Sequence, residues 1–112
     1  MLRITQKRLF DQLRRSQTKI FGKYFLLIYI ENEENQELAV GITVSKKVGN
    51  AVVRNRVRRR LKAILQDFTE PPALSRFLVN IIAKPDAAHV EFTQIKDDIY
   101  TQFQRLNRYA SR

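Results

Sequence analysis

The 112-residue sequence contains no cysteine and only one histidine, His89. Without cysteine the chain has no disulfide, no thiol nucleophile and no cysteine-containing zinc site. His89 lies in a predicted loop and has no second histidine with which to share a metal ion. Asp97 and Asp98 are adjacent on a predicted helix, so they point in different directions and are interpreted as solvated charges. The three glycines are too far apart for a phosphate-binding loop. We therefore expect that the protein alone performs no catalysis and binds no metal or cofactor.

Long hydrophobic runs are also missing. The longest, Tyr24–Ile30, has seven residues, whereas a membrane-spanning helix needs about 20. The first four residues do not lead into the apolar segment of a secretory signal. A hydrophobic content of 44% is normal for a globular chain. We therefore expect a soluble, cytoplasmic protein without a membrane partner, folded as one domain over residues 1–112.

Positive charge is abundant, and it is concentrated in two parts of the chain. The net charge is +10, from 21 basic and 11 acidic residues. Residues 1–24 contain seven basic residues and one acidic residue, and residues 46–62 contain eight basic residues and no acidic residue. Blocks of one sign are typical of a contact surface for a polyanion.

The hydrophobic pattern predicts three helices and at least three strands. A helix over residues 5–15, which Thr5 could cap, precedes a short irregular stretch or weak strand in residues 16–23. Residues 24–31 and 37–44 are predicted to form the two strands of a hairpin. A long helix over 51–68, with Asn50 as its N-cap, is followed by a strand over 77–83 and a helix that begins at 92 or 93 and ends at 109. This order indicates an α+β domain in which helices cover an open sheet, with the strand at 77–83 central.

The long predicted helix has one apolar face and one cationic face. At 100° per residue its apolar stripe consists of Val53, Val57, Leu61, Ile64 and Phe68. Its opposite face and flanks carry Arg54, Asn55, Arg56, Arg58, Arg59, Arg60 and Lys62. Guanidinium groups bind phosphate oxygens with two donors, and the N-terminus of a helix favours anions as well. Lys46 and Lys47 come just before that N-terminus. The pattern favours nucleic-acid binding over a merely solvated face.

Residues 43–59 (TVSKKVGNAVVRNRVRR) closely resemble the signature of the bacterial ribonuclease P protein subunit, with Arg54-Asn55-Arg56 as its "RNR" core. The resemblance continues through residues 77–85 and the last helix, and it is weakest in residues 1–23. It implies an αβββαβα two-layer α-β sandwich, with an open four-stranded sheet and a left-handed β-α-β crossover. This is the fold type of ribosomal protein S5 domain 2.

The resemblance also implies a function. The chain would be the protein subunit of ribonuclease P, an endonuclease that removes the 5′ leader of precursor tRNA to make the mature tRNA 5′ end. It would bind the catalytic ribonuclease P RNA and the leader, and it would need no obligate protein partner. The RNA would hold the catalytic Mg²⁺ ions, and the protein would carry no catalytic residue.

The resemblance implies two sets of contact residues. Those contacting the catalytic RNA would be Lys46, Lys47, Asn50, Arg54, Asn55, Arg56, Arg58, Arg59 and Lys62. A cleft for the leader would be lined by Leu9, Leu13, Leu26, Ile28 and Thr43. The family usually has phenylalanine at the two first-helix positions, and leucine cannot stack on a base as an aromatic ring does. Leu9 and Leu13 are therefore either cleft or core residues, and Phe10 or Phe21 could replace them in the cleft.

Two other functions are compatible with the charge pattern. A structural RNA-binding protein, such as a ribosome component, would be equally small and basic. Binding of duplex DNA by the long helix is the other alternative, although the sequence lacks the short partner helix of a helix-turn-helix unit.

Overall fold

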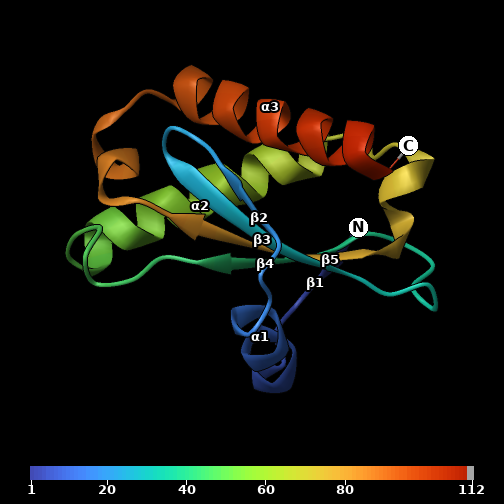
Figure 1. The fold of residues 1–112 in the computed structure, drawn as a ribbon. Coiled ribbons are helices and arrows are strands. Elements are labelled where there is room, and N and C mark those ends of the chain that lie inside the picture. Colours follow the sequence, from blue (N-terminus) through green and yellow to red (C-terminus); the bar gives the residue numbers. More distant parts are fainter. Residues whose placement is uncertain (111–112) are drawn as a thin grey trace.

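The computed structural model describes residues 1–110, and within them a five-stranded sheet has helices on both faces (Figure 1). The strands are β1 (Leu2–Arg3), β2 (Lys19–Phe21), β3 (Phe25–Glu31), β4 (Ala39–Thr43) and β5 (Phe77–Ala83). The helices are α1 (Lys7–Arg14), α2 (Ala51–Asp67) and α3 (Phe92–Ala110), with the short 3-10 helices η1 (Pro72–Arg76) and η2 (Pro85–His89). The α+β class predicted from the sequence is confirmed.

The strand order in the sheet is β1-β4-β5-β3-β2, so β5 is central as predicted. β4 and β5 are parallel neighbours, and α2 makes the crossover between them. β3 lies antiparallel to β5 on its other side, and β2 lies antiparallel to β3. The long basic helix is therefore tied at both ends to the adjacent parallel strands β4 and β5.

Two sequence predictions about the sheet are wrong. β3 and β4 do not form a hairpin, because β5 lies between them: Asn80 of β5 is in register with Ile28 of β3 and with Gly41 of β4. The polar turn after β3 leads to a strand two positions away in the sheet. The sheet also has a fifth strand within the described residues, since Leu2–Arg3 pairs in parallel with Ala39 and Val40. A two-residue strand is too short to show any alternation in the sequence.

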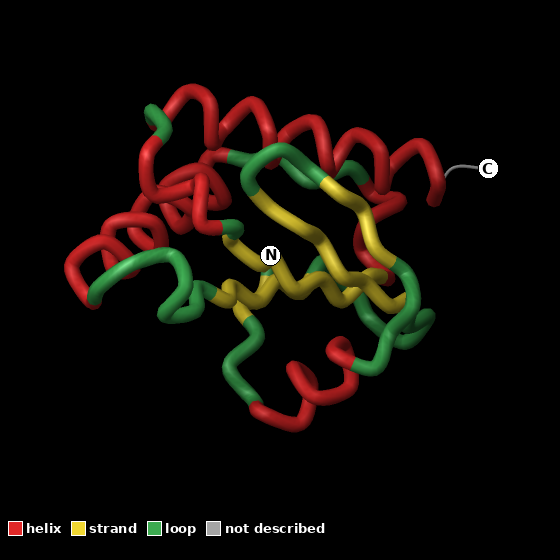
Figure 2. The backbone as a smooth tube through the Cα atoms, turned by 60° about the vertical axis from the view of Figure 1, so that its left-hand side comes forward, coloured by secondary structure: helices red, strands yellow, loops and turns green. Residues whose placement is uncertain are grey.

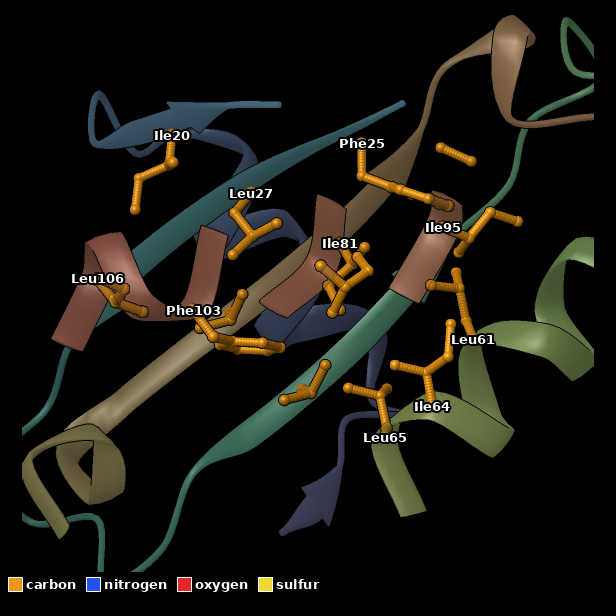
Figure 3. Packing of buried hydrophobic residues seen from close by; sticks show 14 of the residues in the cluster. Ile20, Phe25, Leu27, Leu61, Ile64, Leu65, Ile81, Ile95, Phe103 and Leu106 are labelled. Carbon is orange, nitrogen blue, oxygen red and sulfur yellow. The ribbon is translucent and has the colours of Figure 1, made fainter. Parts of the chain in front are cut away.

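The main core lies between one face of the sheet and helices α2 and α3 (Figure 3). Strands contribute Phe25, Leu27, Val79 and Ile81, and the helices contribute Leu61, Ile64, Ile95, Ile99, Phe103 and Leu106. The predicted apolar stripe of α2 is confirmed, with its end residues Val53 and Phe68 partly buried. This packing fixes which side of α2 remains at the surface.

Helix α1 lies on the opposite face of the sheet, so the predicted two-layer sandwich has a partial third layer (Figures 1 and 2). Its N-cap is Gln6, not the predicted Thr5, and no side chain caps the helix. Leu13 packs there with Ile4 and Leu78, and the ring of Phe10 lies against β4. A Cβ at Gly41 would come 2.5 Å from Phe10 Cε1, so glycine allows the ring to sit on the strand.

Asp98 is a buried residue with a structural role, and the prediction that it is a solvated charge is wrong. Its side chain is 7% exposed. Its carboxylate accepts hydrogen bonds from the backbone N–H groups of Lys23, Tyr24 and Phe25, at 2.9, 3.0 and 3.1 Å. The neighbouring Asp97 is exposed. Asp98 therefore joins α3 to the turn between β2 and β3.

We expect Asp98→Ala to destabilise the domain by about 3 kcal/mol, because each buried donor left unpaired costs about 1–3 kcal/mol. The matched control, Asp97→Ala, removes the same charge from the surface and should change the free energy of unfolding by less than about 0.5 kcal/mol. Urea denaturation followed by circular dichroism measures both. Equal midpoints for the two variants would contradict the structural role of Asp98.

Candidate nucleic-acid interface

The basic helix α2 starts at a well-defined cap. Asn50 Oδ1 accepts a hydrogen bond from Val53 N at 3.0 Å, which confirms the predicted N-cap. Val48 is buried in the main core and anchors the preceding turn, and Gly49 has a φ of +156° that other residues rarely adopt. Lys46 and Lys47 are exposed on this turn. The two ammonium groups are thus held near the positive end of the helix dipole.

The cationic face of α2 is not neutralised from within the protein. Among residues 1–110, ion pairs involve only Met1, Arg14 and Arg76 as cations. Asn55, Arg59 and Lys62 are exposed, and Arg54 is half-buried. No carboxylate in the described part of the chain pairs with a basic residue of the segment 46–62. This surface, defined by Lys46, Lys47, Arg54, Asn55, Arg59 and Lys62, is called the basic surface below.

Three other arginines of α2 also attach the helix to neighbouring loops. Arg56 Nη2 donates to Ala88 O and Arg60 Nη1 donates to Val90 O, both at 3.0 Å, in the segment that leads into α3. Arg58 donates to Val44 O and to Asn55 Oδ1, both at 3.3 Å. A backbone carbonyl does not cancel the charge of a guanidinium group. These arginines therefore keep their positive charge and in addition hold α2 in place.

A groove of about 320 Å³ lies beside α1, on the sheet face opposite the main core. Helix α1 covers only part of that face, where its one buried residue, Leu13, packs with Ala39 and Leu78. The groove is lined by Phe10, Arg14, Ile28, Ile42, Thr43, Val44, Arg58, Asn80 and Ile82. It has apolar strand residues and an aromatic ring, with one guanidinium group from α1 and one from α2. Arg58 connects the groove to the basic surface.

The predicted cleft residues divide between this groove and the core. Ile28 and Thr43 line the groove. Leu26 is half-buried and shares the Ile28 face of β3, but it is not among the lining residues. Leu13 is fully buried and Leu9, partly buried, packs against the same small cluster, so of the two alternatives left open for these leucines the structure favours the core. Both take part in the core beneath α1.

The aromatic residue that lines the groove is Phe10, which follows Leu9 in the sequence. Phe21 lies on the edge strand β2 and borders a different hollow, between the β2–β3 turn and α3. Three apolar side chains on a two-turn helix do not reveal which of them points into the core. The bare Gly41 beneath the ring is the signal that sequence reasoning missed.

The described residues contain neither a candidate metal site nor a candidate membrane-spanning helix. Between positions 1 and 110 there is no group of three or more histidine, cysteine, aspartate or glutamate side chains that could hold a metal ion. His89 is exposed at the end of η2. No helix in the same part of the chain has the length and hydrophobicity that a membrane span requires.

Known proteins resemble this chain in sequence and in fold. The family model described as Ribonuclease P matches residues 1–107. The ribonuclease P protein component of Citrifermentans bemidjiense is 37% identical over 109 residues, covering 95% of this chain and 89% of that protein. The one from Bacillus velezensis is 33% identical over 100 residues, covering 89% and 84%.

Solved structures agree with the architecture. The Staphylococcus aureus RNase P protein superposes with a TM-score of 0.80 at 22% identity and covers 95% of each chain. The Thermotoga maritima RNase P protein gives a TM-score of 0.79 at 20% identity, covering 94% of this chain and 97% of that one. At such identities the structures establish the fold, and the family follows from the sequence matches. This chain therefore belongs to the ribonuclease P protein component family.

Proposed function

We propose that this subunit of ribonuclease P binds the catalytic RNA through the basic surface, together with Arg56 and Arg58. The observation that carries the proposal is the absence, within residues 1–110, of any carboxylate paired with the cations of α2 and its preceding turn. Several like charges on one helix repel each other, and the phosphates of a folded RNA relieve that repulsion while releasing counterions. Asn55, beside them, offers a donor and an acceptor to a sugar or base edge.

The groove beside α1 is proposed to bind the 5′ leader of precursor tRNA. Single-stranded nucleic acid is bound by combining aromatic or apolar contacts to bases with cations that follow the backbone. The groove offers Phe10, Ile28 and Ile82 for contacts to bases. It offers Arg14 and Arg58 as cations for the backbone. Because Arg58 also belongs to α2, one protein surface can contact the catalytic RNA and its substrate together. The protein thereby helps to hold the leader in position for cleavage.

In this proposal the chemistry takes place in the RNA, which holds the catalytic Mg²⁺ ions. The protein contributes positive charge and a binding groove, so its effect should be largest where magnesium is scarce and phosphate repulsion is least screened. The cytoplasm, where tRNA is processed, is the compartment in which we place the complex.

Reconstitution tests the proposal. The purified chain is added to ribonuclease P RNA and precursor tRNA at a magnesium concentration at which the RNA alone is slow. We expect restored cleavage at the mature 5′ end, no cleavage by the protein alone, and a smaller stimulation with a substrate whose leader is one nucleotide long. Absence of stimulation would contradict the proposal. So would sequencing of RNA co-purified in mild salt, if it returned ribosomal RNA in place of ribonuclease P RNA.

A further inference from the structure

Asn80 is the single polar residue of the central strand β5, whose sequence is FLVNIIA. It is 7% exposed and lies between Ile28 on β3 and Gly41 on β4. A polar amide at the centre of a sheet is unfavourable unless its hydrogen bonds are satisfied. The other residues of β5 are all apolar and suit a buried strand, so the presence of an amide at position 80 needs a separate explanation.

Half of the Asn80 amide is satisfied by the protein. Thr43 Oγ1 donates a hydrogen bond to Asn80 Oδ1 at 2.9 Å. Both residues line the groove beside α1. The side-chain nitrogen, Nδ2, has no hydrogen-bonding partner among residues 1–110. It is also not fully enclosed by protein atoms. Thr43 therefore fixes the orientation of the amide, and Nδ2 is left as a donor with two N–H groups.

The surroundings of this donor are mostly apolar. The ring of Phe10 lies over Gly41 on one side, and Ile28 and Ile82 line the groove with it. A hydrogen bond formed in such surroundings is stronger than one formed in water, and a donor that meets another donor there is correspondingly unfavourable. The guanidinium groups of Arg14 and Arg58 also line the groove and suit the phosphates on either side of a bound base.

We propose that Asn80 is a specificity-determining residue, which donates a hydrogen bond from Nδ2 to an acceptor atom on one nucleobase of the leader. The inference rests on the proposed leader binding and adds to it a preference at a single nucleotide position. A base that presents a ring nitrogen or carbonyl oxygen to Nδ2 is favoured. A base that presents an amino group at the same point is disfavoured, because two donors then face each other.

The test uses the reconstituted holoenzyme and precursor tRNAs that differ at one leader position at a time. The ratio of kcat/KM between the best and the worst base is compared with the ratio for the RNA alone. We expect the wild-type protein to enlarge this ratio at one position. Asn80→Leu, which removes the donor at similar size, should reduce it by about threefold to tenfold, the effect of one hydrogen bond. Gln104→Leu makes the same change on the exposed side of α3 and should leave the ratio unchanged.

A second variant and a modified substrate keep the test independent of how well Asn80→Leu folds. In Thr43→Val the amide can turn over, so we expect a smaller ratio in a protein that remains folded. A leader carrying a base analogue that lacks the ring-nitrogen or carbonyl acceptor should lose the preference with the wild-type protein. With Asn80→Leu the same analogue should cause no further loss.

The outcomes separate the two proposals. If the wild-type protein stimulates leader-dependent cleavage but Asn80→Leu or Thr43→Val keeps the full base ratio, the role of Asn80 is overturned and leader binding stands. The same holds if the wild-type protein keeps its preference on the leader that carries the analogue. A wild-type ratio no larger than that of the RNA alone also overturns it. If the wild-type protein gives no leader-dependent stimulation, leader binding itself fails.

Discussion

Replacement of Leu61 by aspartate is expected to unfold the domain. Leu61 is 0% exposed and packs from α2 into the main core between the sheet and helices α2 and α3, together with Ile64 and Ile81 (Figure 3). Loss of the leucine side chain costs about 2–5 kcal/mol. The unpaired carboxylate adds a desolvation penalty of several kcal/mol more. Their sum is comparable with the whole stability of an ordinary domain, about 5–15 kcal/mol.

The control for Leu61→Asp is Ala63→Asp, on the exposed side of the same helix. It adds the same charge, so it separates burial from electrostatics. Thermal melting followed by circular dichroism, in a buffer free of polyanions, should show a cooperative transition for Ala63→Asp and none for Leu61→Asp. A normal melting curve for Leu61→Asp would show that α2 is turned the wrong way round, and the basic surface would then have to be reassigned.

The combined variant Lys47→Ala, Arg59→Ala and Lys62→Ala is expected to bind ribonuclease P RNA far more weakly while remaining folded. All three residues are exposed, and their side chains have no ion-pair or hydrogen-bond partner within the described residues. Each lost phosphate contact lowers the slope of log affinity against log salt by about 0.9, so three contacts lower it by about 2.7. With the electrostatic contribution vanishing near 1 M salt, this corresponds to a loss of about 500-fold at 0.1 M.

A matched triple variant keeps the change in net charge equal. Lys19→Ala, Lys23→Ala and Arg108→Ala also removes three positive charges, but from the β2 edge and the end of α3. Filter binding over a salt series should show a much smaller change in slope for this control. Similar slopes for the two triples would mean that net charge alone, and not the surface on α2, attracts the RNA.

The helices and the central strand could be predicted from the sequence because their patterns are local. The 3.6-residue periodicity of α2 reflects burial of one side of the helix. The continuous apolar run of β5 reflects burial of both faces of the strand. Strand pairing is not local. β3 and β4 are adjacent in sequence and joined by a polar turn, yet each pairs with β5. Nothing in residues 24–44 encodes a partner that begins at residue 77.

The charge of the candidate nucleic-acid interface could be predicted from the sequence, but the hydrogen bonds of its side chains could not. The side of α2 that faces outwards follows from its apolar stripe, so the exposure of Arg59 and Lys62 was expected. The helix pattern does not show where Ala88 and Val90 will lie, so the hydrogen bonds from Arg56 and Arg60 were not expected. Asp98 was misread for the same reason, because its partners belong to a turn about 75 residues earlier in the chain.

The position of β5 has a consequence for biosynthesis. Until residue 77 and those after it have left the ribosome, β4 can pair only with the two residues of β1, and β3 only with the three of β2. Two-stranded ribbons of that length are not stable in water. The nascent chain therefore carries an exposed cationic segment before it has a sheet to support it, and folding must wait for the last third of translation.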